Sequence, residues 1–448
     1  SARNKWDNIG KPLRSLGRLE EMVIQLAGIT GNLNPTVDKK AVIIFCADNG
    51  VVSEGVTQTG QEVTAVVSTN FTKGIATINS FARVLGADVF PVDVGINKDM
   101  SSVKGIINRK VSMGTKDILK GQAMTRSECI QAIIAGIEIV HTLKDKGYNM
   151  FITGEMGIGN TTTSSAILSV LEDIPVEKVT GKGAGLTKNG INHKIEVINT
   201  AIKVNAPNKN DVIEVMAKLG GFDICAIAGA FLGGAIYHVP VIIDGFISAV
   251  SANCAIHLSK VCSDYMFASH VSAEPAGQMA LNAIGKVAYI NAGMCLGEGT
   301  GAVLLAQLFD YALSAYNETA DFDKAKCKLR CGYTTGTCAA IAAKAAVKML
   351  LEKNDVIREQ IITPNKTKVS VEIFDIDYSD TFVSCAVKKD AGDDPDVTNG
   401  IMIYAKAEFI DFDSEKEMQD IKIVIDGGIG VGRVTKLGLS QAAHVPVV

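Results

Sequence analysis

Runs of consecutive apolar, largely β-branched residues recur between residues 41 and 243, and each run ends in small or polar residues. Because these runs are apolar at successive positions, they predict strands that are buried on both faces. Stretches with helical periodicity lie between them, among them 126–146 and 162–171. Strands that alternate with helices predict an α/β fold with a doubly wound parallel sheet. The predicted strands are 41–46, 88–94, 149–153 and 239–243.

Polar residues follow three of these strands directly. They are Asp48-Asn49-Gly50, Gly154-Glu155 and Asp244-Gly245. In an open parallel sheet the ligand binds at the carboxyl ends of the strands. We therefore expect the three segments to contribute to one ligand site.

The character of the sequence changes after residue 316. Residues 317–327 are rich in charge and predict a linker between a domain of residues 1–316 and a module of residues 328–448. An Ala-rich helix is predicted over 338–351. It is followed by alternating or β-branched segments at 368–374, 381–387, 401–409 and 421–425. The second part is therefore expected to be a separate α+β module.

Charge and hydropathy exclude several classes of protein. The 448 residues carry a net charge of −4, without the basic excess that nucleic-acid binding requires. No apolar run reaches the roughly 18 residues of a membrane span. The polar start of the chain lacks the apolar core of a secretory signal, so a cytoplasmic location is expected.

The ten cysteines are dispersed, which is typical of reduced, buried thiols in a protein of this length. Cys327, Cys331 and Cys338 lie close together in sequence, but no histidine or second cysteine pair accompanies them. Packed or incidental thiols are expected there, and no metal site.

The segment 154–163, Gly-Glu-Met-Gly-Ile-Gly-Asn-Thr-Thr-Thr, carries the strongest chemical signal. It leads from a predicted strand into a predicted helix, where glycines and free N–H groups suit the approach of an anion. A tight turn with a capping threonine explains the same pattern, so phosphate binding and a structural turn stay open alternatives. No Gly-Lys-Ser/Thr follows, which disfavours an NTPase. No Gly-x-Gly-x-x-Gly follows the first strand, which disfavours an NAD-type oxidoreductase.

Two glutamates stand in glycine-rich turns, Glu155 in the segment above and Glu298 in Gly297-Glu298-Gly299. An acid beside an anion site weakens binding unless it faces a cationic group or transfers a proton. A glutamate in a helix-entry loop is the alternative for each residue alone. Their joint presence favours catalysis over a binding or sensing protein, which would gain nothing from two acids beside a phosphate.

Two further segments carry weaker signals. The loop 180–186 is rich in glycine, and Lys194 downstream could add a positive charge to an anion site, although most helical lysines are simply solvated. In segment 269–274, His270 could act as a general base. A hydrogen-bonded structural histidine is the favoured interpretation.

These motifs occur in one order across some 300 residues, and with them residues 11–316 resemble nicotinate-nucleotide:dimethylbenzimidazole phosphoribosyltransferase. The segments that carry the resemblance are Lys11-Pro12, 15–20, 47–51, 92–95, 154–162, 220–223, 244–246, 269–274 and 296–301. The resemblance implies a six-stranded parallel sheet flanked by helices, a small helical domain built from both ends, and a homodimer. It also implies transfer of phosphoribose from nicotinate mononucleotide to a benzimidazole-type base, without a cofactor.

The resemblance assigns roles residue by residue. Glu298 is the expected catalytic base, and Glu155 is the second active-site glutamate. Phosphate and ribose are expected to bind to Gly157, Asn160, Thr161, Gly183, Lys194 and Ser272. The base is expected to bind between Thr59, Met156, Ile158 and Leu296.

Two segments depart from the pattern of this family. Leu13-Arg14 replaces the usual Pro-Gly, and Val66-Val67 stands where many relatives carry a glutamine. Loss of an amide makes the base pocket more apolar. Dimethylbenzimidazole or a near relative is the expected acceptor, with purines, phenols and other benzimidazoles as alternatives.

The C-terminal module resembles the first third of cobalt-precorrin-5B C(1)-methyltransferase, through segments 330–340, 389–398 and 427–432. A complete enzyme of that family uses S-adenosylmethionine, so we expect this module to fold but not to methylate alone. The run Asp390 to Asp396 is expected to be a solvated acidic loop rather than a divalent-metal site. The missing initiator methionine and the short module are expected to mark a fragment. Both resemblances point to corrinoid synthesis.

Overall fold

The computed structural model describes residues 1–183, 185–321, 330–364, 366–394, 396–409 and 424–428, and the backbone of 432–433 and 446–447. The chain divides into two compact units. The first unit comprises Ser1–Asp7 and Leu16–Thr319, and the second comprises Asn8–Ser15 and Ala320–Val448.

The first unit is built on a six-stranded parallel sheet in the order β3-β2-β1-β4-β5-β6. The central strand β1 pairs with β2 on one side and with β4 on the other, so that Ala41 lies opposite Asp88 and Phe151. It is buried at all eight positions, as expected for a strand covered by helices on both faces. The strands are β1 Lys40–Ala47, β2 Asp88–Gly95, β3 Ile107–Asn108, β4 Met150–Met156, β5 Val241–Ile243 and β6 Met266–Ala268.

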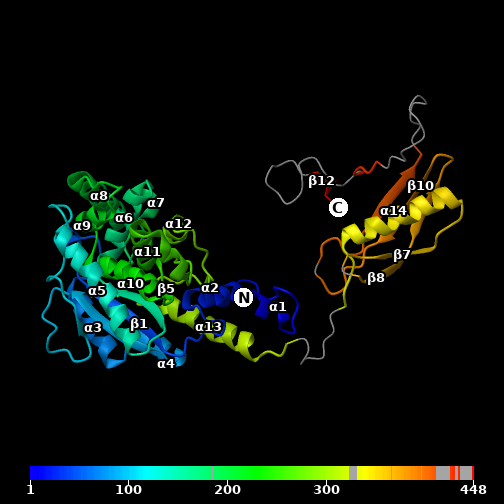
Figure 1. Ribbon diagram of the computed structural model, residues 1–448. Helices are drawn as coiled ribbons and strands as arrows, with labels where there is room; N and C mark the ends of the chain where they lie inside the picture. The colour runs from blue at the N-terminus through cyan, green and yellow to red at the C-terminus, as the bar shows by residue number, and fades with distance from the viewer. Residues whose placement is uncertain are drawn as a thin grey trace. The chain divides into compact units, whose positions relative to one another are not determined.

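Two neighbouring residues of β4 identify the two helical layers. The Thr153 hydroxyl pairs with Ser248 of α11 at 2.7 Å, while Gly154 abuts the backbone of Glu298 just before α13. Successive strand residues face opposite sides, so α11 and α13 lie on opposite faces of the sheet (Figure 1). Helices α10 and α11 cover one face, with α5 outside α10. Helices α3, α4 and α13 cover the other.

The helices of this unit are α1 Ala2–Asn8, α2 Arg18–Thr30, α3 Glu62–Lys73, α4 Thr77–Leu85, α5 Arg126–Asp145, α6 Asn160–Leu171, α7 Val176–Val179, α8 Lys188–Asn205, α9 Val212–Leu219, α10 Phe222–Tyr237, α11 Phe246–Leu258, α12 Gly277–Ala283 and α13 Thr300–Glu318, with short 3-10 helices η1 Gly50–Glu54 and η2 Lys260–Tyr265. Near the start of the chain, the Trp6 ring packs on Tyr316 of α13 with centroids 4.9 Å apart. Helix α2 packs on α13 as well. This is the expected helical assembly from both ends of the domain.

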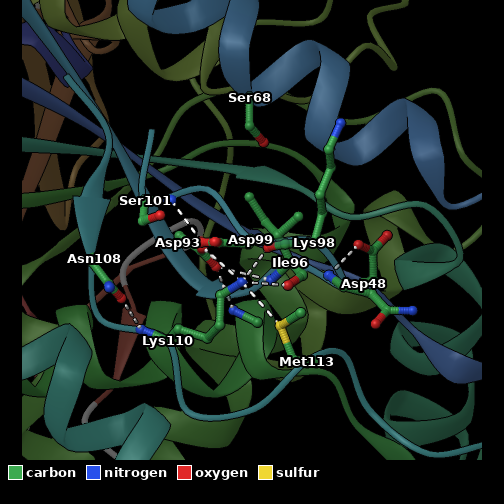
Figure 2. A network of polar contacts seen from close by, with 12 residues as sticks. Asp48, Ser68, Asp93, Ile96, Lys98, Asp99, Ser101, Asn108, Lys110 and Met113 are labelled. Atoms are coloured by element: carbon green, nitrogen blue, oxygen red, sulfur yellow. Dashed lines mark hydrogen bonds and ion pairs between the residues drawn. The ribbon is translucent and has the colours of Figure 1, made fainter. Parts of the chain in front are cut away.

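A lysine-centred network fixes the loop after β2. Figure 2 shows the Lys110 ammonium between the Asp93 carboxylate, 3.2 Å away, and the carbonyl oxygens of Ile96 and Lys98, at 2.7 and 2.5 Å. Within the same loop, the Asn97 N–H donates to Asp48 Oδ2 at 2.8 Å. Asp48, directly after β1, and Asp93, near the end of β2, are therefore engaged in holding this loop.

The second unit consists of a helix on a small antiparallel sheet. Helix α14 Thr335–Glu352 packs on a three-stranded sheet in the order β11-β10-β9 and on the hairpin β7-β8 (Figure 1). Its core includes Cys338, Ile341, Val383 and Cys385. The strands are β7 Arg358–Ile362, β8 Lys368–Glu372, β9 Phe374–Tyr378, β10 Phe382–Lys388, β11 Met402–Glu408, β12 Gly432–Arg433 and β13 Pro446–Val447.

The predicted fold class is confirmed, and the differences concern boundaries and short elements. The expected strand 368–374 is two strands separated at Ile373, because β8 pairs with β7 while β9 pairs with β10 in another sheet. The strands β3, β6 and β7 were not predicted. Most of the expected strand 421–425 lies outside the described residues, and its last two residues are not in a strand. Helix α13 continues to Glu318, and 322–327 of the expected linker 317–327 lie outside the described residues.

Candidate active site

A cavity of about 310 Å³ opens at the carboxyl ends of β4 and β5. Its wall is formed by the strand end and loop 155–161, the start of α11, the loop after β6 and the turn before α13, together with residues of the loop before α3, of α3 itself and of the loop 180–186. Its lining includes Val56, Thr57, Val67, Gly183, Phe246, His270, Ser272, Glu274, Cys295, Leu296 and both predicted glutamates. The sheet therefore places Glu155, Glu298 and the Gly157–Thr161 turn around one space.

The buried side-chain amide of Asn160 holds the Glu155 carboxyl group. Glu155 is the penultimate residue of β4 and is only 8% exposed. The Asn160 side-chain nitrogen donates one short hydrogen bond to Glu155 Oε2 and another to Asp223 Oδ2, at 3.1 Å. Asn160 begins α6, and Asp223 lies in the first turn of α10. One amide thus joins two carboxyl groups from different elements.

Glu298 stands in a strained turn. Gly297, Glu298 and Gly299 have φ values of 86°, 60° and 92°, so a non-glycine residue adopts the left-handed conformation between two glycines. The turn is pinned by Asp244, whose carboxylate accepts the N–H groups of Gly299 and Ala302 at 3.2 and 3.0 Å. Glu298 Oε2 is buried and has no hydrogen-bond partner. That oxygen is free to receive a proton.

The glycines around the two glutamates are required by close approach. A Cβ on Gly154 would lie 2.6 Å from the Glu298 carbonyl oxygen, and a Cβ on Gly297 would lie 2.3 Å from Glu155 Oε1. A side chain at Gly154 would therefore separate the strand end from the turn before α13, and a side chain at Gly297 would displace the Glu155 carboxyl group. The glycine motifs around the two acids bring these acids together.

Burial raises the pKa values of these carboxyl groups. Desolvation, reinforced by the charges of Asp223, Asp244 and Glu298, raises the pKa of Glu155 to about 8. Desolvation likewise raises the pKa of Asp223 to about 7 and raises the pKa of Glu298. At neutral pH, Glu155 is therefore largely a neutral acid. Groups with such shifts in a cavity are typical of catalytic sites.

A lysine lies behind the predicted phosphate loop. Lys194 is 1% exposed, and its ammonium donates to Thr161 Oγ1 at 2.8 Å and to the Gly181 carbonyl at 3.4 Å. Desolvation lowers its pKa to about 8, while Glu274 acts in the opposite direction. Gly183, with φ 51°, lies against both Thr161 and this ammonium. The Lys194 ammonium therefore does not line the cavity itself, but it contacts the hydroxyl of Thr161, which does.

Most of the residues predicted for the site line the cavity, and two do not. The lining includes Glu155, Met156, Gly157, Ile158, Asn160, Thr161, Gly183, Ser272, Leu296 and Glu298. Lys194 lies one contact behind the wall. Thr59 is also off the wall, because Thr57 occupies that place and Thr59 only contacts it, at 3.4 Å. Spacing within a loop cannot distinguish these two threonines.

The expected contribution of Asp48-Asn49-Gly50 to the cavity wall is wrong. Asp48 accepts the Asn97 N–H instead, and the Asn49 carbonyl accepts from Gln61 at 2.9 Å. Of the three strand ends, those of β4 and β5 reach the cavity. The β1 end is used to hold neighbouring loops.

Sequence reasoning missed the role of Asp223. Its segment, Gly220-Gly221-Phe222-Asp223, was noted only as a motif of the resemblance, although an acid two residues after a double glycine at a helix start was a usable signal. His270 lines the cavity but is 3% exposed, pairs with Ser269 at 3.0 Å and packs on Gly301. These contacts fit the structural interpretation of this histidine.

The acids of the C-terminal loop reach solvent, and two of them also form ion pairs. Asp393 and Asp394 are exposed, in agreement with the expected solvated loop. Asp390 pairs with Arg330 through both carboxylate oxygens, and Asp396 pairs with the buried Lys389. Of the predicted thiol cluster, Cys331 is exposed and Cys338 is buried, while Cys327 lies outside the described residues. Across the described parts of the chain, no group of three or more His, Cys, Asp or Glu could hold a metal ion.

The first unit has the features of a group-transfer enzyme that acts on a phosphorylated substrate. Its parallel α/β fold presents an anion-type turn, a lysine and two carboxyl groups of raised pKa around one cavity at the strand ends. Residues 1–327 match the family described as Phosphoribosyltransferase, and the chain belongs to that family.

Named relatives specify the family further. The chain is 52% identical over 325 residues to the nicotinate-nucleotide–dimethylbenzimidazole phosphoribosyltransferase of Ruminiclostridium cellulolyticum, covering 72% of this chain and 92% of that protein. It is 48% identical over 324 residues to the Clostridium acetobutylicum protein of the same name, with the same coverage. The crystal structure of CobT from Thermus thermophilus superposes with a TM-score of 0.70 at 35% identity, over 73% of this chain and 98% of that one.

The second unit has a different relationship. Residues 322–447 match the CbiD family, whose members depend on S-adenosylmethionine. The chain is therefore a CobT-type phosphoribosyltransferase followed by a partial CbiD module. No helix in the described residues is long and apolar enough to cross a membrane.

Proposed function

We propose that the first unit transfers phosphoribose from nicotinate mononucleotide to 5,6-dimethylbenzimidazole or a related base, giving α-ribazole phosphate and nicotinate. The observation that carries this proposal is the Glu298 carboxyl group, which has one oxygen without a partner and lines the same cavity as the Gly157–Thr161 turn. A carboxyl group that can take the acceptor's proton and a site for the donor phosphate therefore lie within reach of one bound substrate pair.

The chemistry needs one proton acceptor. The nicotinate ring of the donor is a pyridinium, so the bond from C1′ to the ring nitrogen breaks with its electron pair going to that nitrogen. An acceptor nitrogen attacks C1′ from the opposite face, inverting β to α, and the N–H of the acceptor must lose its proton. Glu298 takes this proton, which its raised pKa favours.

Substrate positioning is assigned to the remaining wall. Lys194, Thr161 and Gly183 would hold the phosphate, while Asn160 and Ser272 border the ribose position. A charged ammonium and a helix N-terminus both favour an anion there. No cofactor is needed for this step, because the substrate already carries its activated leaving group.

An apolar pocket is proposed for the acceptor base. Met156, Ile158 and Leu296 line it, and Val67 lies where many relatives carry a glutamine. An apolar wall suits the methylated ring of dimethylbenzimidazole. Adenine and p-cresol are the informative competitors, because one adds polar edges and the other lacks a ring nitrogen.

The test is release of nicotinate from nicotinate mononucleotide, assayed with each of these acceptors. We expect Glu298→Gln to lower turnover by about a hundredfold or more, because general-base catalysis contributes on this scale, while donor binding stays measurable by calorimetry. Glu196→Gln on the exposed face of α8 is the matched control. Near-normal turnover in Glu298→Gln would remove the base assignment. Donor binding without nicotinate release by the unaltered chain would favour the binding-protein alternative.

For the remainder of the chain we propose a domain of residues 1–316, a linker of 317–327 and a module of 328–448. The partial CbiD module is proposed not to methylate by itself, and the first unit is proposed to form a homodimer. Light scattering of the purified chain measures whether the first unit forms a homodimer. Transfer of a labelled methyl group measures whether the module methylates by itself.

A further inference from the structure

A buried amide joins two carboxyl groups beneath the cavity, and only one of them faces the substrate space. Asn160 uses both hydrogens of its side-chain nitrogen, one for Glu155 and one for Asp223. Asp223 is fully buried and does not line the cavity. Its other oxygen, Oδ1, has no hydrogen-bond partner.

The charges that act on this pair are predominantly acidic. Glu155 faces Asp223 from α10, Asp244 from the end of β5 and Glu298 from the turn before α13. From β1 it faces the Cys46 thiol, which burial keeps protonated by raising its pKa. Two carboxylates that share a buried site cannot both ionise cheaply, so one of them retains its proton.

His270 and Lys194 lie on the far sides of this site. His270 acts on Asp244, and the Lys194 ammonium is directed to Thr161 and Gly181. Neither is among the main charges that act on Glu155. Because no nearby positive charge offsets the two acids, one of the two carboxyl groups stays protonated. Besides burial, the charges of Asp223, Asp244 and Glu298 all raise the pKa of Glu155, so we assign the retained proton to Glu155.

We propose that Asp223 is a positioning residue that holds the Glu155 carboxyl group through Asn160 and keeps it neutral while Glu298 ionises. This inference rests on the proposed function. A neutral Glu155 does not repel the phosphate and carboxylate of the donor, and its O–H can donate a hydrogen bond into the cavity beside Gly297. Of the two glutamates that line the cavity, Glu298 is then the one that is ionised and stabilises positive charge at C1′.

The first test is the pH dependence of KM for nicotinate mononucleotide. In the unaltered chain we expect KM to rise as pH passes through about 8, where Glu155 ionises. Asp223→Asn keeps the shape but removes a neighbouring negative charge, so the pKa of Glu155 falls. The rise in KM should then move to lower pH by about one unit, with a smaller change in kcat.

The Glu155→Gln variant makes the comparison specific. A glutamine cannot ionise, so KM in Glu155→Gln should lack this rise, and adding Asp223→Asn should produce no further shift. A merely structural role for Asp223 predicts instead the same loss in both backgrounds. An unshifted KM profile in Asp223→Asn, or an equal shift without Glu155, overturns the proposal.

An infrared titration keeps the inference testable if Asp223→Asn does not fold. The difference spectrum between the unaltered chain and Glu155→Gln should contain the carbonyl band of a protonated carboxyl at pH 7, and lose it as pH rises through about 8. Only carboxylate bands at pH 7 would overturn the proposal. This readout requires no turnover, whereas absence of nicotinate release from the unaltered chain would count against the proposed function alone.

Discussion

At the scale of single residues, the site depends on side chains held where they are unfavourable in isolation. Glu298 occupies the left-handed region at φ 60° and buries an oxygen without a partner. Glu155 shares a dry site with another acid. Strain of this kind persists only where the surrounding structure enforces it, here through Asp244 and the backbone beside Gly154. Function and stability are therefore opposed at position 298.

This opposition predicts the outcome of Glu298→Gly. Glycine adopts positive φ without the Cβ clash, so the free energy of unfolding should rise by about 1 kcal/mol while nicotinate release is lost. Ala206→Gly is the control, because Ala206 ends α8 at φ 39° away from the cavity and should gain stability with activity retained. The chain's single tryptophan, Trp6, reports unfolding of the first unit by fluorescence. A loss of stability in Glu298→Gly would contradict the strain argument.

At the scale of elements, the long helices and central strands were predictable because each carries its own periodic signal. Helix α5 was expected at 126–146 and spans Arg126–Asp145. The short strands β3 and β6 were not predicted, since two or three residues contain no period and pair only in the assembled sheet. The close packing of α5 on α10 could not be predicted from the sequence either. Gly136 and Gly229 make it possible, because a Cβ on either would lie within about 2 Å of a carbonyl oxygen of the other helix.

This packing makes Gly229→Ala a sharp test of the helical layer. The new methyl group would lie 2.0 Å from the Ile133 carbonyl oxygen, so α10 must shift from α5, at a cost of about 3 kcal/mol. Gly28→Ala in α2 is the matched control, since a Cβ there meets nothing within 4 Å. It should stabilise the chain by about 0.5–1 kcal/mol. Equal effects of the two substitutions in urea unfolding would refute the packing argument.

At the scale of the whole molecule, the chain consists of two units with separate hydrophobic cores. Every residue that lines the cavity belongs to the first unit, between Val56 and Glu298. The change in sequence character after residue 316 predicts a linker of 317–327, because a linker needs charge and solubility rather than apolar periodicity, and the first unit ends at Thr319. The segment Asn8–Ser15, which groups with the second unit, was assigned from sequence to the first domain.

The division predicts that phosphoribosyl transfer does not need the second unit. A chain that ends at Asp321 should keep kcat and KM within about twofold, because it retains every wall residue and the core of the first unit. The assay is nicotinate release by the shortened and the full chain side by side, with circular dichroism as the control for folding. A folded but inactive short chain would mean that the second unit contributes to the site.

The sequence by itself determined the α/β class, the order of the main elements and the glycine-rich turns with their two glutamates. Each of these is a local property, recorded in periodicity or in residue type. Only the tertiary structure decided which polar strand ends share a cavity, that Asp48 is engaged in holding a loop, and that Asp223 reaches Glu155 through Asn160. Those facts depend on groups far apart in the chain meeting in a dry interior, where burial and neighbouring charge set protonation, and no local pattern encodes that environment.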